Sequence, residues 1–255
     1  MRKYFDILNA TKKADTSFYA IPQPVNCIFD TTFFKRSFGV MVFRVNHLET
    51  SVVNQKYQNI HHKFVESETL INYLDCLIKI DQVCLSGYKS FTVDGRAGVI
   101  KILNQRYLNI PVQMCIFHQV QIVLRYTTRN PKNDCGKDLK KFILTLKSAT
   151  KQEFTEGLNE LLTKYEGYLG EYTINPITNR KQYIHRNHRS AFRSIKRHLK
   201  YLFTFQDYPQ VNIPPTTNSC DGSFGHWKAK VKLHRGISLL RKQQIIDEFL
   251  KPGLS

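Results

Sequence analysis

The sequence predicts a mixed α/β fold, in which a mixed sheet is flanked by helices and interrupted by a long helical insertion. Three observations predict it. The N-terminal part holds runs of β-branched and aromatic residues, helical and strand-like patterns alternate after residue 66, and the stretch from about 130 to 205 has helical periodicity. Because antiparallel strands come first and helix-linked strands follow, we expect a mixed sheet with helices packed on it.

The first predicted elements are strands. Residues 25–34 and 38–45 flank the turn-prone Lys35-Arg36-Ser37 and predict a hairpin, and a weaker third strand is expected near 52–60. Residues 66–80 carry apolar side chains at spacings of three and four, which predicts an amphipathic helix. The expected order continues with a strand at 88–93, a helix at 97–107, a buried strand at 111–117 and a helix from about His118.

A change of character near residue 130 sets the predicted domain organisation. We expect a lead-in segment at 1–24, the first part of the core at 25–129, an all-helical insertion at 130–210 and C-terminal helices at 211–255 that complete the core. In the insertion, Thr150 and Glu153 have the spacing of a capping box. The last segment is predicted to form two helices, separated at His234-Arg235-Gly236.

The composition restricts the class of protein. Lys and Arg number 38 against 20 Asp and Glu, a formal net charge of +18, which favours nucleic acid as a partner; a merely basic or ribosome-associated protein is the alternative. Six scattered cysteines without a CxxC pair indicate reduced thiols. No apolar run has the length of a signal peptide or a membrane span, so we expect a soluble, intracellular protein without a membrane partner.

Two aspartates occupy positions where a carboxylate needs a partner. Asp30 lies in an apolar strand, where its charge is costly to desolvate unless a cation or hydrogen bonds compensate it. Asp94 follows a strand, and ligand sites of open α/β sheets lie at strand ends. Asp94-Gly95 is also a strong turn dipeptide, which is the alternative interpretation. If the two strands are neighbours, both carboxylates face one cleft and form a hard oxygen site that suits Mg²⁺ or Mn²⁺.

Asp221 is the third candidate. Asn218 is expected to cap a helix, with Asp221 as its third residue. An acid at that place is also ordinary helix-start chemistry, since it interacts favourably with the positive end of the helix dipole. The position alone is therefore compatible with a capping acid as well as with a metal ligand.

These motifs follow one another along most of the chain. They are the strand with Asp30, then FTVDGRAGVIKIL, PVQMCIFH, the helical insertion, and IPPTTNSCDGSF with HRGIS behind it, from about Val25 to Leu250. The most specific parts are Asp94-Gly95-x-x-Gly98, Cys115-x-x-His118 and Thr217-Asn218 with His234-x-Gly236. The succession resembles bacterial insertion-sequence transposases of the Mutator-like class. The resemblance implies an RNase H-like catalytic domain for DNA transposition and recombination.

The resemblance also implies a metal-binding triad, made of Asp30, Asp94 and Asp221, that holds two ions, Mg²⁺ or Mn²⁺. The chain departs from the family at Asp221, where the family usually has Glu. The shorter side chain ends roughly 1 Å earlier, and a misplacement of that size can cost about a hundredfold in rate.

Cys115 and His118 have half of a zinc-type spacing, without a second pair. Core packing is expected for Cys115. For His118 the resemblance implies a supporting catalytic role, a contact to the scissile phosphate, while a purely structural histidine is the alternative.

Two basic clusters are candidate DNA-binding surfaces. A predicted helix over 187–204 presents one stripe of cations: Arg186, Arg189, Arg193, Lys196, Arg197 and Lys200. A second cluster follows Asp221: Lys228, Lys230, Lys232, His234 and Arg235. Such rows can follow a phosphate backbone and release its counterions, although a solvated helix face is the alternative. Tyr183, Phe192 and Trp227 are candidates for stacking on bases, with Phe192 more typical of a core position.

The working hypothesis from sequence is two-metal phosphoryl transfer, with cleavage at the element ends and strand transfer to target DNA. The expected partners are double-stranded DNA and further copies of the chain, in the bacterial cytoplasm at the nucleoid. Only 29 residues precede Asp30, where the family carries a DNA-binding region, so we expect that region to be missing or supplied by a separately encoded polypeptide. The alternatives are an inactive DNA-binding transposase remnant and an RNase H-like nuclease or resolvase.

Overall fold

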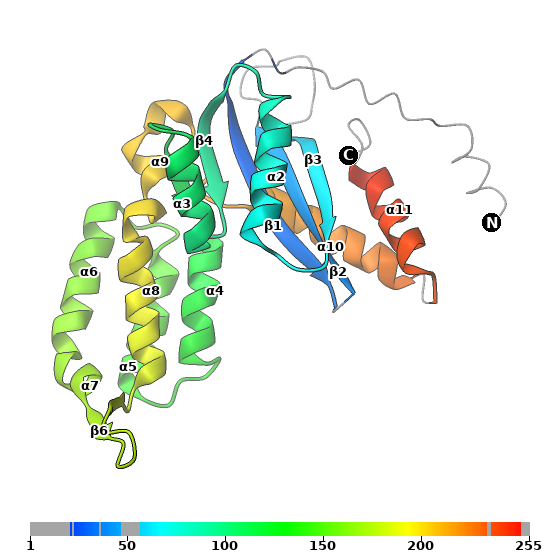
Figure 1. Cartoon of the computed structure of the whole chain (residues 1–255). Helices are drawn as coiled ribbons and strands as arrows, with labels where there is room; N and C mark the ends of the chain where they lie inside the picture. Colours follow the sequence, from blue (N-terminus) through cyan, green and yellow to red (C-terminus); the bar gives the residue numbers. More distant parts are fainter. Residues whose placement is uncertain (1–20, 22, 36, 47–56, 234–235, 251–255) are drawn as a thin grey trace, which may run out of the picture.

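A five-stranded mixed sheet forms the centre of the protein (Figure 1). The computed structural model describes residues 21, 23–35, 37–46, 57–233 and 236–250. The strand order is β3-β2-β1-β4-β5, in which β1 pairs antiparallel with β2 and parallel with β4. The strands are β1 (Val25–Phe34), β2 (Phe38–Asn46), β3 (Tyr57–Val65), β4 (Tyr88–Val93) and β5 (Val112–Met114). The predicted hairpin and the predicted mixed sheet are both confirmed.

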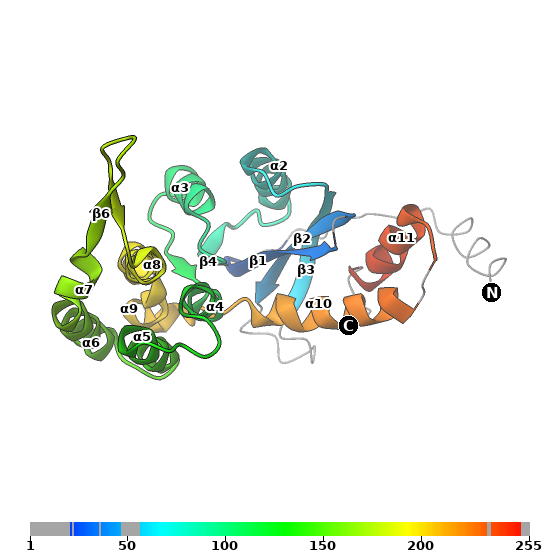
Figure 2. The same cartoon turned by 90° about the horizontal axis from the view of Figure 1, so that it is seen from below.

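Helices cover both faces of this sheet, as Figure 2 shows. On one face lie α2 (Leu70–Asp81) and α3 (Ala97–Arg106), and across the other runs α10 (Asn218–Leu233). The chain leaves β5 through α4 (Ile116–Thr127), and α11 (Leu239–Leu250) packs against α10 and β3.

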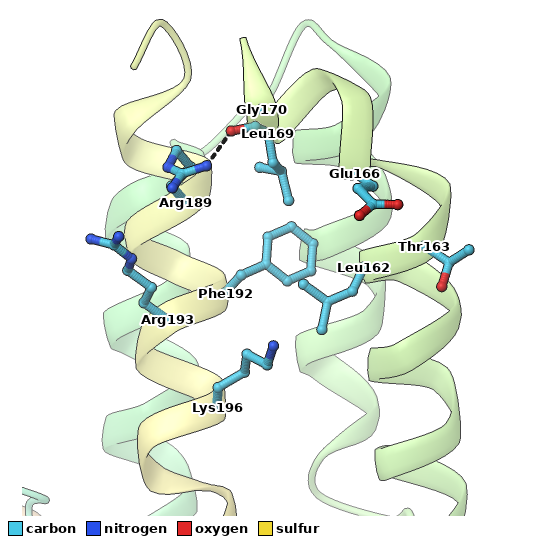
Figure 3. Close-up of a pocket in the computed structure, with 9 residues that line it drawn as sticks. All are labelled: Leu162, Thr163, Glu166, Leu169, Gly170, Arg189, Phe192, Arg193 and Lys196. Atoms are coloured by element: carbon cyan, nitrogen blue, oxygen red, sulfur yellow. Dashed lines mark hydrogen bonds between the residues drawn. The ribbon is translucent and has the colours of Figure 1, made fainter. Parts of the chain in front are cut away.

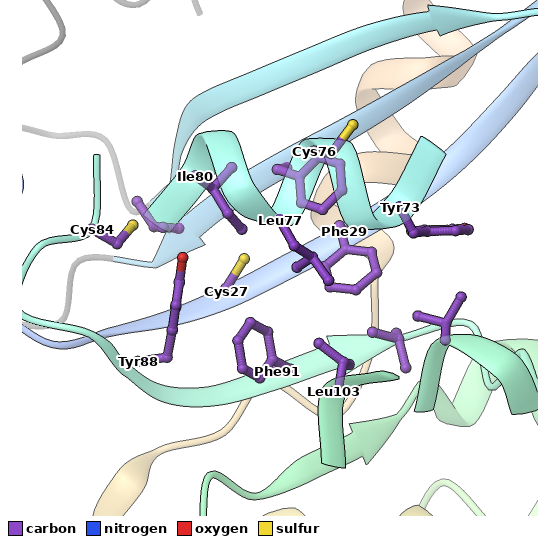
Figure 4. Close-up of a cluster of buried hydrophobic side chains, with 14 of the residues drawn as sticks. Cys27, Phe29, Tyr73, Cys76, Leu77, Ile80, Cys84, Tyr88, Phe91 and Leu103 are labelled. Atoms are coloured by element: carbon purple, nitrogen blue, oxygen red, sulfur yellow. The ribbon is translucent and has the colours of Figure 1, made fainter. Parts of the chain in front are cut away.

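Side chains of β1 alternate between the two faces of the sheet, and each face packs into a separate hydrophobic core. Cys27 and Phe29 point towards α2 and belong to the cluster shown in Figure 4. Ile28 and Phe34 point the other way and pack with the apolar side of α10. Asp30 shares the parity of Ile28 and Phe34, so its side chain lies on the face that α10 covers.

The insertion packs as a helical bundle against the end of the sheet that β5 forms. Its helices are α5 (Asp134–Thr145), α6 (Lys151–Lys164), α7 (Glu166–Gly170), α8 (Arg186–Leu202), α9 (Thr204–Asp207) and the 3₁₀ turn η1 (Pro209–Val211). The capping box of Thr150 and Glu153 is confirmed at the start of α6. Gln113 of β5 joins the bundle to the sheet, since its amide donates to the carbonyl of Leu202 at 2.9 Å and accepts from the backbone N–H of Phe205 at 3.0 Å.

The expectation of an all-helical insertion at 130–210 is wrong in one place. β6 (Tyr172–Ile174) and β7 (Lys181–Tyr183) form an antiparallel hairpin between α7 and α8. Pro176 cannot continue a helix, and Asn179 adopts a left-handed conformation with φ of 51°, which asparagine tolerates better than most residues. These two residues turn the chain back on itself where a helix was expected.

The boundary between β5 and α4 also differs from the prediction of a strand over 111–117. The strand ends at Met114, and the carbonyl of Cys115 already accepts the N–H of Gln119 at 3.1 Å, as at the start of a helix. His118 consequently lies in the first turn of α4, where it points back towards the sheet end.

Other expectations fall partly outside the described residues. The weak strand expected near 52–60 corresponds to β3, which begins at Tyr57, and residues 47–56 are not described. All six cysteines are free and buried. Among the described helices, none combines the length and the apolar character that crossing a membrane requires.

Candidate metal centre

Asp30, His118 and Asp221 converge from three elements that are far apart in the sequence. Each offers one ligand atom, and these atoms lie within 4.8 Å of one another. His118 Nε2 stands 3.8 Å from Asp30 Oδ2. The group sits where β1 passes the ends of β4 and β5, between the start of α4 and the start of α10. Two carboxylates and an imidazole at this spacing could hold a divalent cation.

The carboxylate of Asp30 is buried, with 6% of the residue exposed. Burial raises the pKa of Asp30 to about 7; the neighbouring His118 opposes this rise, whereas the negative charges of Asp221 and Asp94 add to it. The backbone N–H of Thr31 donates to Oδ1 at 2.7 Å and so fixes the orientation of the group. A nearby cation would strongly stabilise the ionised form of a carboxylate that is buried in this way.

The hydroxyl of Thr217 lies among all three candidate ligands. Its Oγ1 is 3.1 Å from Asp30 Oδ2, 3.4 Å from His118 Nδ1 and 3.5 Å from Asp221 Oδ2. A hydroxyl carries one proton, and the shortest of these contacts directs it to Asp30. Thr217 is completely buried, so this contact is shielded from water. Sequence reasoning noted Thr217 as part of a motif and assigned it no role.

His118 is held in position by Cys115 and by the acids. Burial alone lowers the pKa of an imidazole, but a hydrogen bond with Cys115 and the negative charges of Asp30 and Asp94 outweigh that effect and raise the pKa of His118 to about 9. Cys115 itself is completely buried, as expected, and its Sγ accepts the backbone N–H of Thr217 at 3.3 Å. The Cys115-x-x-His118 motif thus connects α4 to the segment that precedes Asp221.

Asp94 lies beside this group but is not one of the three converging residues. β1 and β4 are parallel neighbours, as the prediction required, with Ile28 opposite Thr92. Asp94 Oδ1 accepts the backbone N–H of Arg96 at 3.0 Å, the local contact that is typical of an Asx turn. Gly95 has φ of 90°, and a Cβ there would lie 2.3 Å from Met114, so no other residue fits without displacement.

A further acid near Asp94 escaped sequence reasoning. Glu68, just before α2, forms a 2.8 Å ion pair with Arg96 and accepts a hydrogen bond from the hydroxyl of Tyr73. Burial raises the pKa of Asp94, and the charge of Glu68 raises it further. Glu68 follows β3 in an unremarkable polar segment, and its nearness to Asp94 arises only from the packing of α2 against the sheet.

Buried polar side chains place the helix that carries Asp221. Arg44 of β2 is 7% exposed; its guanidinium donates to the carbonyl of Ser219 and to the hydroxyl of Ser223 at 3.0 Å, on either side of Asp221. The preceding segment is fixed by Thr92, whose hydroxyl donates to the carbonyl of Pro214 at 2.7 Å. Arg44 has no motif around it, which is why the sequence did not identify it.

The start of α10 also corrects an expectation. The carbonyl of Thr217 accepts the N–H groups of Cys220 and Asp221, at 2.8 and 3.2 Å, so Asn218 is the first helical residue and not the cap. Asp221 is therefore the fourth residue of the helix. Its carboxylate faces Asp30 and His118, which a purely capping acid would not do.

The six cations expected on one stripe lie on α8, and all but Arg189 are exposed. Arg189 is half-buried, donates to the carbonyl of Leu169 and stacks over the ring of Tyr183 at 3.5 Å. Figure 3 shows it with Arg193 and Lys196 beside a cavity of about 500 Å³ between α8 and the helices α6 and α7.

A second cavity beside α8, of about 600 Å³, adds a cation that sequence reasoning missed. Arg193 and Arg197 of α8 line it together with Arg125 of α4. Arg125 is seven residues after His118 and so lies on the same side of α4. Three guanidinium groups border one hollow, which makes it suited to a phosphate.

On α10, Lys228, Lys230 and Lys232 are exposed, whereas His234 and Arg235 lie outside the described residues. Phe192 and Trp227 are each 3% exposed and belong to the cores, so neither is free to stack on a base. Tyr183 is half-buried beneath Arg189. Two of the three aromatic residues singled out from sequence are therefore structural.

Comparison with models of known protein families gives no match, and comparison with characterised proteins gives none at a significant level. The geometry of the chain's own residues is therefore the basis for a functional proposal.

Proposed function

We propose that this chain is the catalytic domain of a DNA transposase, with an RNase H-like fold, that cleaves and joins DNA strands with the help of divalent metal ions. The observation that carries the proposal is the convergence of Asp30, Asp221 and His118, with Asp94 at the end of the neighbouring strand. Asp30 and Asp221 are 191 positions apart in the sequence, and the fold brings them together in one site.

The topology supports the RNase H-like part of the proposal. Three antiparallel strands are followed by two parallel, helix-linked strands, and the segment after the insertion returns to the sheet to place α10 beside β1. The acids of the first strand and of the helix after the insertion thereby meet at one end of the sheet, and Asp94, at the end of the fourth strand, lies beside them outside the converging group.

The basic surfaces support nucleic acid as the substrate. α4 carries His118 near its start and Arg125 further along, beside the cations of α8. α10 carries Asp221 near its start and exposed lysines further along. Positive charge thus flanks the acids along both helices, and such surfaces attract the phosphate backbone of DNA over distance. The expected partners, transposon ends, target DNA and further copies of the chain, are part of this proposal.

The chain's own residues fit a metal-dependent reaction. A bound Mg²⁺ or Mn²⁺ would lower the pKa of a water molecule and stabilise charge on the scissile phosphate. Asp30 and Asp221 would hold the cation, and Thr31 and Thr217 fix the carboxylate of Asp30. A second ion would need Asp94 as an additional ligand.

Two features of the site affect the reaction. The pKa of His118 is about 9 in the metal-free site, so its imidazole is cationic there at neutral pH, and we propose that it contacts a phosphate oxygen of the DNA. Asp221 has a shorter side chain than the glutamate that the resemblance implies at this position. The hydrogen bonds from Arg44 to Ser219 and Ser223 hold its helix against the sheet. Closer approach of the helix is the means by which a shorter acid reaches a shared cation.

A non-catalytic DNA-binding protein is the second candidate. The observation that favours it is the place of Asp94, whose Oδ1 is engaged by Arg96 and which stands outside the converging group. In that case the basic surfaces would bind DNA and the acids would hold at most a structural ion.

The test is a cleavage assay with Mn²⁺ and labelled duplex DNA. We expect nicks that disappear in Asp30→Asn and in Asp221→Asn and persist in Glu160→Gln, an exposed acid of α6 that serves as the matched control. Joined strands in the products distinguish a transposase from a nuclease or resolvase. DNA binding without nicks at any Mn²⁺ concentration would support the non-catalytic candidate.

A further inference from the structure

A cavity of about 730 Å³ lies between the tip of the β1–β2 hairpin and the second half of α10. Its volume is within the range of about 300–1,000 Å³ that is typical of ligand sites. Its apolar part is formed by Phe34, Phe38 and Val231, which are buried residues of the core on the α10 face. The rings of Phe34 and Phe38 are stacked in this wall, with centroids 4.9 Å apart and an interplanar angle of 9°.

The hairpin tip also places an aromatic side chain at the surface. Phe33 lines the cavity and is 37% exposed. It pairs across the strands with Gly39, and a Cβ on Gly39 would lie 2.7 Å from its ring. The missing side chain therefore lets the ring of Phe33 rest against β2. Because side chains alternate along β1, this ring lies on the face of the hairpin opposite Phe34 and Phe38, so the apolar wall of the cavity is formed by Phe34, Phe38 and Val231.

The rim of the cavity is strongly basic. Lys35, Lys228, Lys232 and Lys242 line it, and no acid is found among its described lining residues. The ammonium of Lys228 lies 6.0 Å from the ring centre of Phe34. An apolar hollow with four lysines at its edge is complementary to a ligand that has a flat apolar part and negative charge.

The two walls of this cavity belong to the elements that carry Asp30 and Asp221. Phe34 follows Asp30 by four residues on the same face of β1, about 13 Å along an extended strand. Lys228 follows Asp221 by seven residues on the same side of α10, about 10 Å along the helix. A strand in duplex DNA advances about 3.4 Å per nucleotide, so the cavity lies roughly three to four nucleotides from the metal centre.

We propose that this cavity binds an unpaired nucleotide of the DNA strand that is held at the metal centre. The base would occupy the apolar part formed by Phe34, Phe38 and Val231, and the phosphates on either side of it would contact the lysines. This inference rests on the proposed function, because it takes the DNA strand to run from Asp30 and Asp221 towards the hairpin tip. Recognition of this kind is tolerant of sequence, since every base offers a flat face to an aromatic ring.

The test measures DNA affinity by fluorescence anisotropy, in EDTA and at fixed salt. A duplex of about 20 base pairs is compared with the same duplex carrying a single-stranded 3′ overhang of about four nucleotides, and with an overhang that lacks its bases. We expect the overhang to strengthen binding about tenfold and the abasic overhang to lose most of that gain. Phe34→Leu, which removes a ring from the apolar wall and keeps its apolar bulk, and the double variant K232A/K242A should lose the preference for the overhang.

Matched controls separate the cavity from general effects. Lys147→Ala removes an exposed lysine of the insertion, and Tyr208→Ala removes an aromatic side chain that is 43% exposed between α9 and η1. Both should keep the preference. A thermal unfolding curve for each variant identifies any that fail to fold. For the unmodified protein, 2-aminopurine in the overhang should change its emission on binding, while 2-aminopurine inside the duplex should not.

Equal affinity for blunt and overhanging DNA would overturn the inference, and this is the outcome expected if the cavity takes a fatty acid or an acidic peptide instead. Full binding of the abasic overhang would also overturn it, because phosphates alone would then account for the gain. Since the assay contains no metal, it is independent of cleavage. An overhang preference without nicking in Mn²⁺ would support the cavity and reject the enzyme.

Discussion

Replacing Asp30 with Asn should stabilise the metal-free protein at alkaline pH. Burial raises the pKa of Asp30 from 3.8 to about 7, so the folded state binds this proton more tightly than the unfolded chain does. The contribution to folding is therefore fully favourable below about pH 4 and is lost as the pH rises towards 7. At pH 8 the loss amounts to about 4 kcal/mol, an upper bound because water entering the site relieves part of it.

An asparagine keeps the shape of the side chain and removes the charge. Its carbonyl oxygen can still accept from the backbone N–H of Thr31, and its NH₂ group can donate to the hydroxyl of Thr217, which reverses its role. For a domain of this size, 1 kcal/mol shifts the melting temperature by about 2–4 °C, so Asp30→Asn should melt up to about 16 °C higher than the wild type at pH 8. Near pH 4 the two should differ little.

The assay is thermal unfolding across pH, with and without Mn²⁺. Mn²⁺ at about 100 times its Kd should stabilise the wild type by about 2.7 kcal/mol, and Asp30→Asn should show almost none of this gain. Glu160→Gln should follow the wild type in every condition, because Glu160 is exposed on α6. An Asp30→Asn protein that melts below the wild type at pH 8, or that responds fully to Mn²⁺, would contradict the assignment of Asp30 as a buried metal ligand.

Other predictions concern pH, the remaining ligands and the basic surface. Because the pKa of Asp30 is about 7 and that of His118 about 9, and ligands must lose their protons, Mn²⁺ affinity measured by calorimetry should rise steadily from pH 6 to pH 9; a flat profile would contradict the assignment. His118→Gln distinguishes two roles of the histidine. If His118 is a metal ligand, the variant should bind Mn²⁺ more weakly. If His118 contacts the phosphate instead, the variant should bind Mn²⁺ as the wild type does and cleave DNA more slowly at saturating Mn²⁺. Asp221→Glu, the acid usual in the transposases that the sequence resembles, should lower the nicking rate, because Arg44 already holds α10 at the distance that suits the shorter side chain; a higher rate would contradict this placement. Arg193→Glu on α8 should weaken binding to all duplexes alike and reduce the salt slope by at least about 1, whereas Lys147→Glu should leave the slope as it is.

Periodicity and composition were sufficient to predict the sheet. The strand over 88–93 has its predicted bounds, and the hairpin of β1 and β2 follows from β-branched and aromatic runs around a turn. The same signals failed where local preferences conflict. The apolar run after Pro111 suits a strand as well as a buried helix start, and the three-residue strands β6 and β7 are too short to show a period.

The candidate site could be predicted only where a carboxylate stood in an unusual local setting. Asp30 was identifiable because an acid inside an apolar strand is costly. Glu68 and Arg44 were not, because each has an ordinary sequence environment and acquires its contacts from elements far along the chain. Thr217 lay in a quoted motif, yet its central place among the ligands depends on the path of the segment after the insertion.

The alternation of side chains along β1 restricts which insertions this strand can accept. One amino acid inserted between Val25 and Cys27 would exchange the two faces of β1 from that point on, so Asp30 would turn towards α2, and Cys27 and Phe29 would turn towards α10. Two inserted amino acids would restore the face and displace the acid by about 7 Å along the strand, out of reach of its partners. Length variation among homologues should therefore be absent from this strand and tolerated at the β6–β7 tip, where Ile177 is 92% exposed.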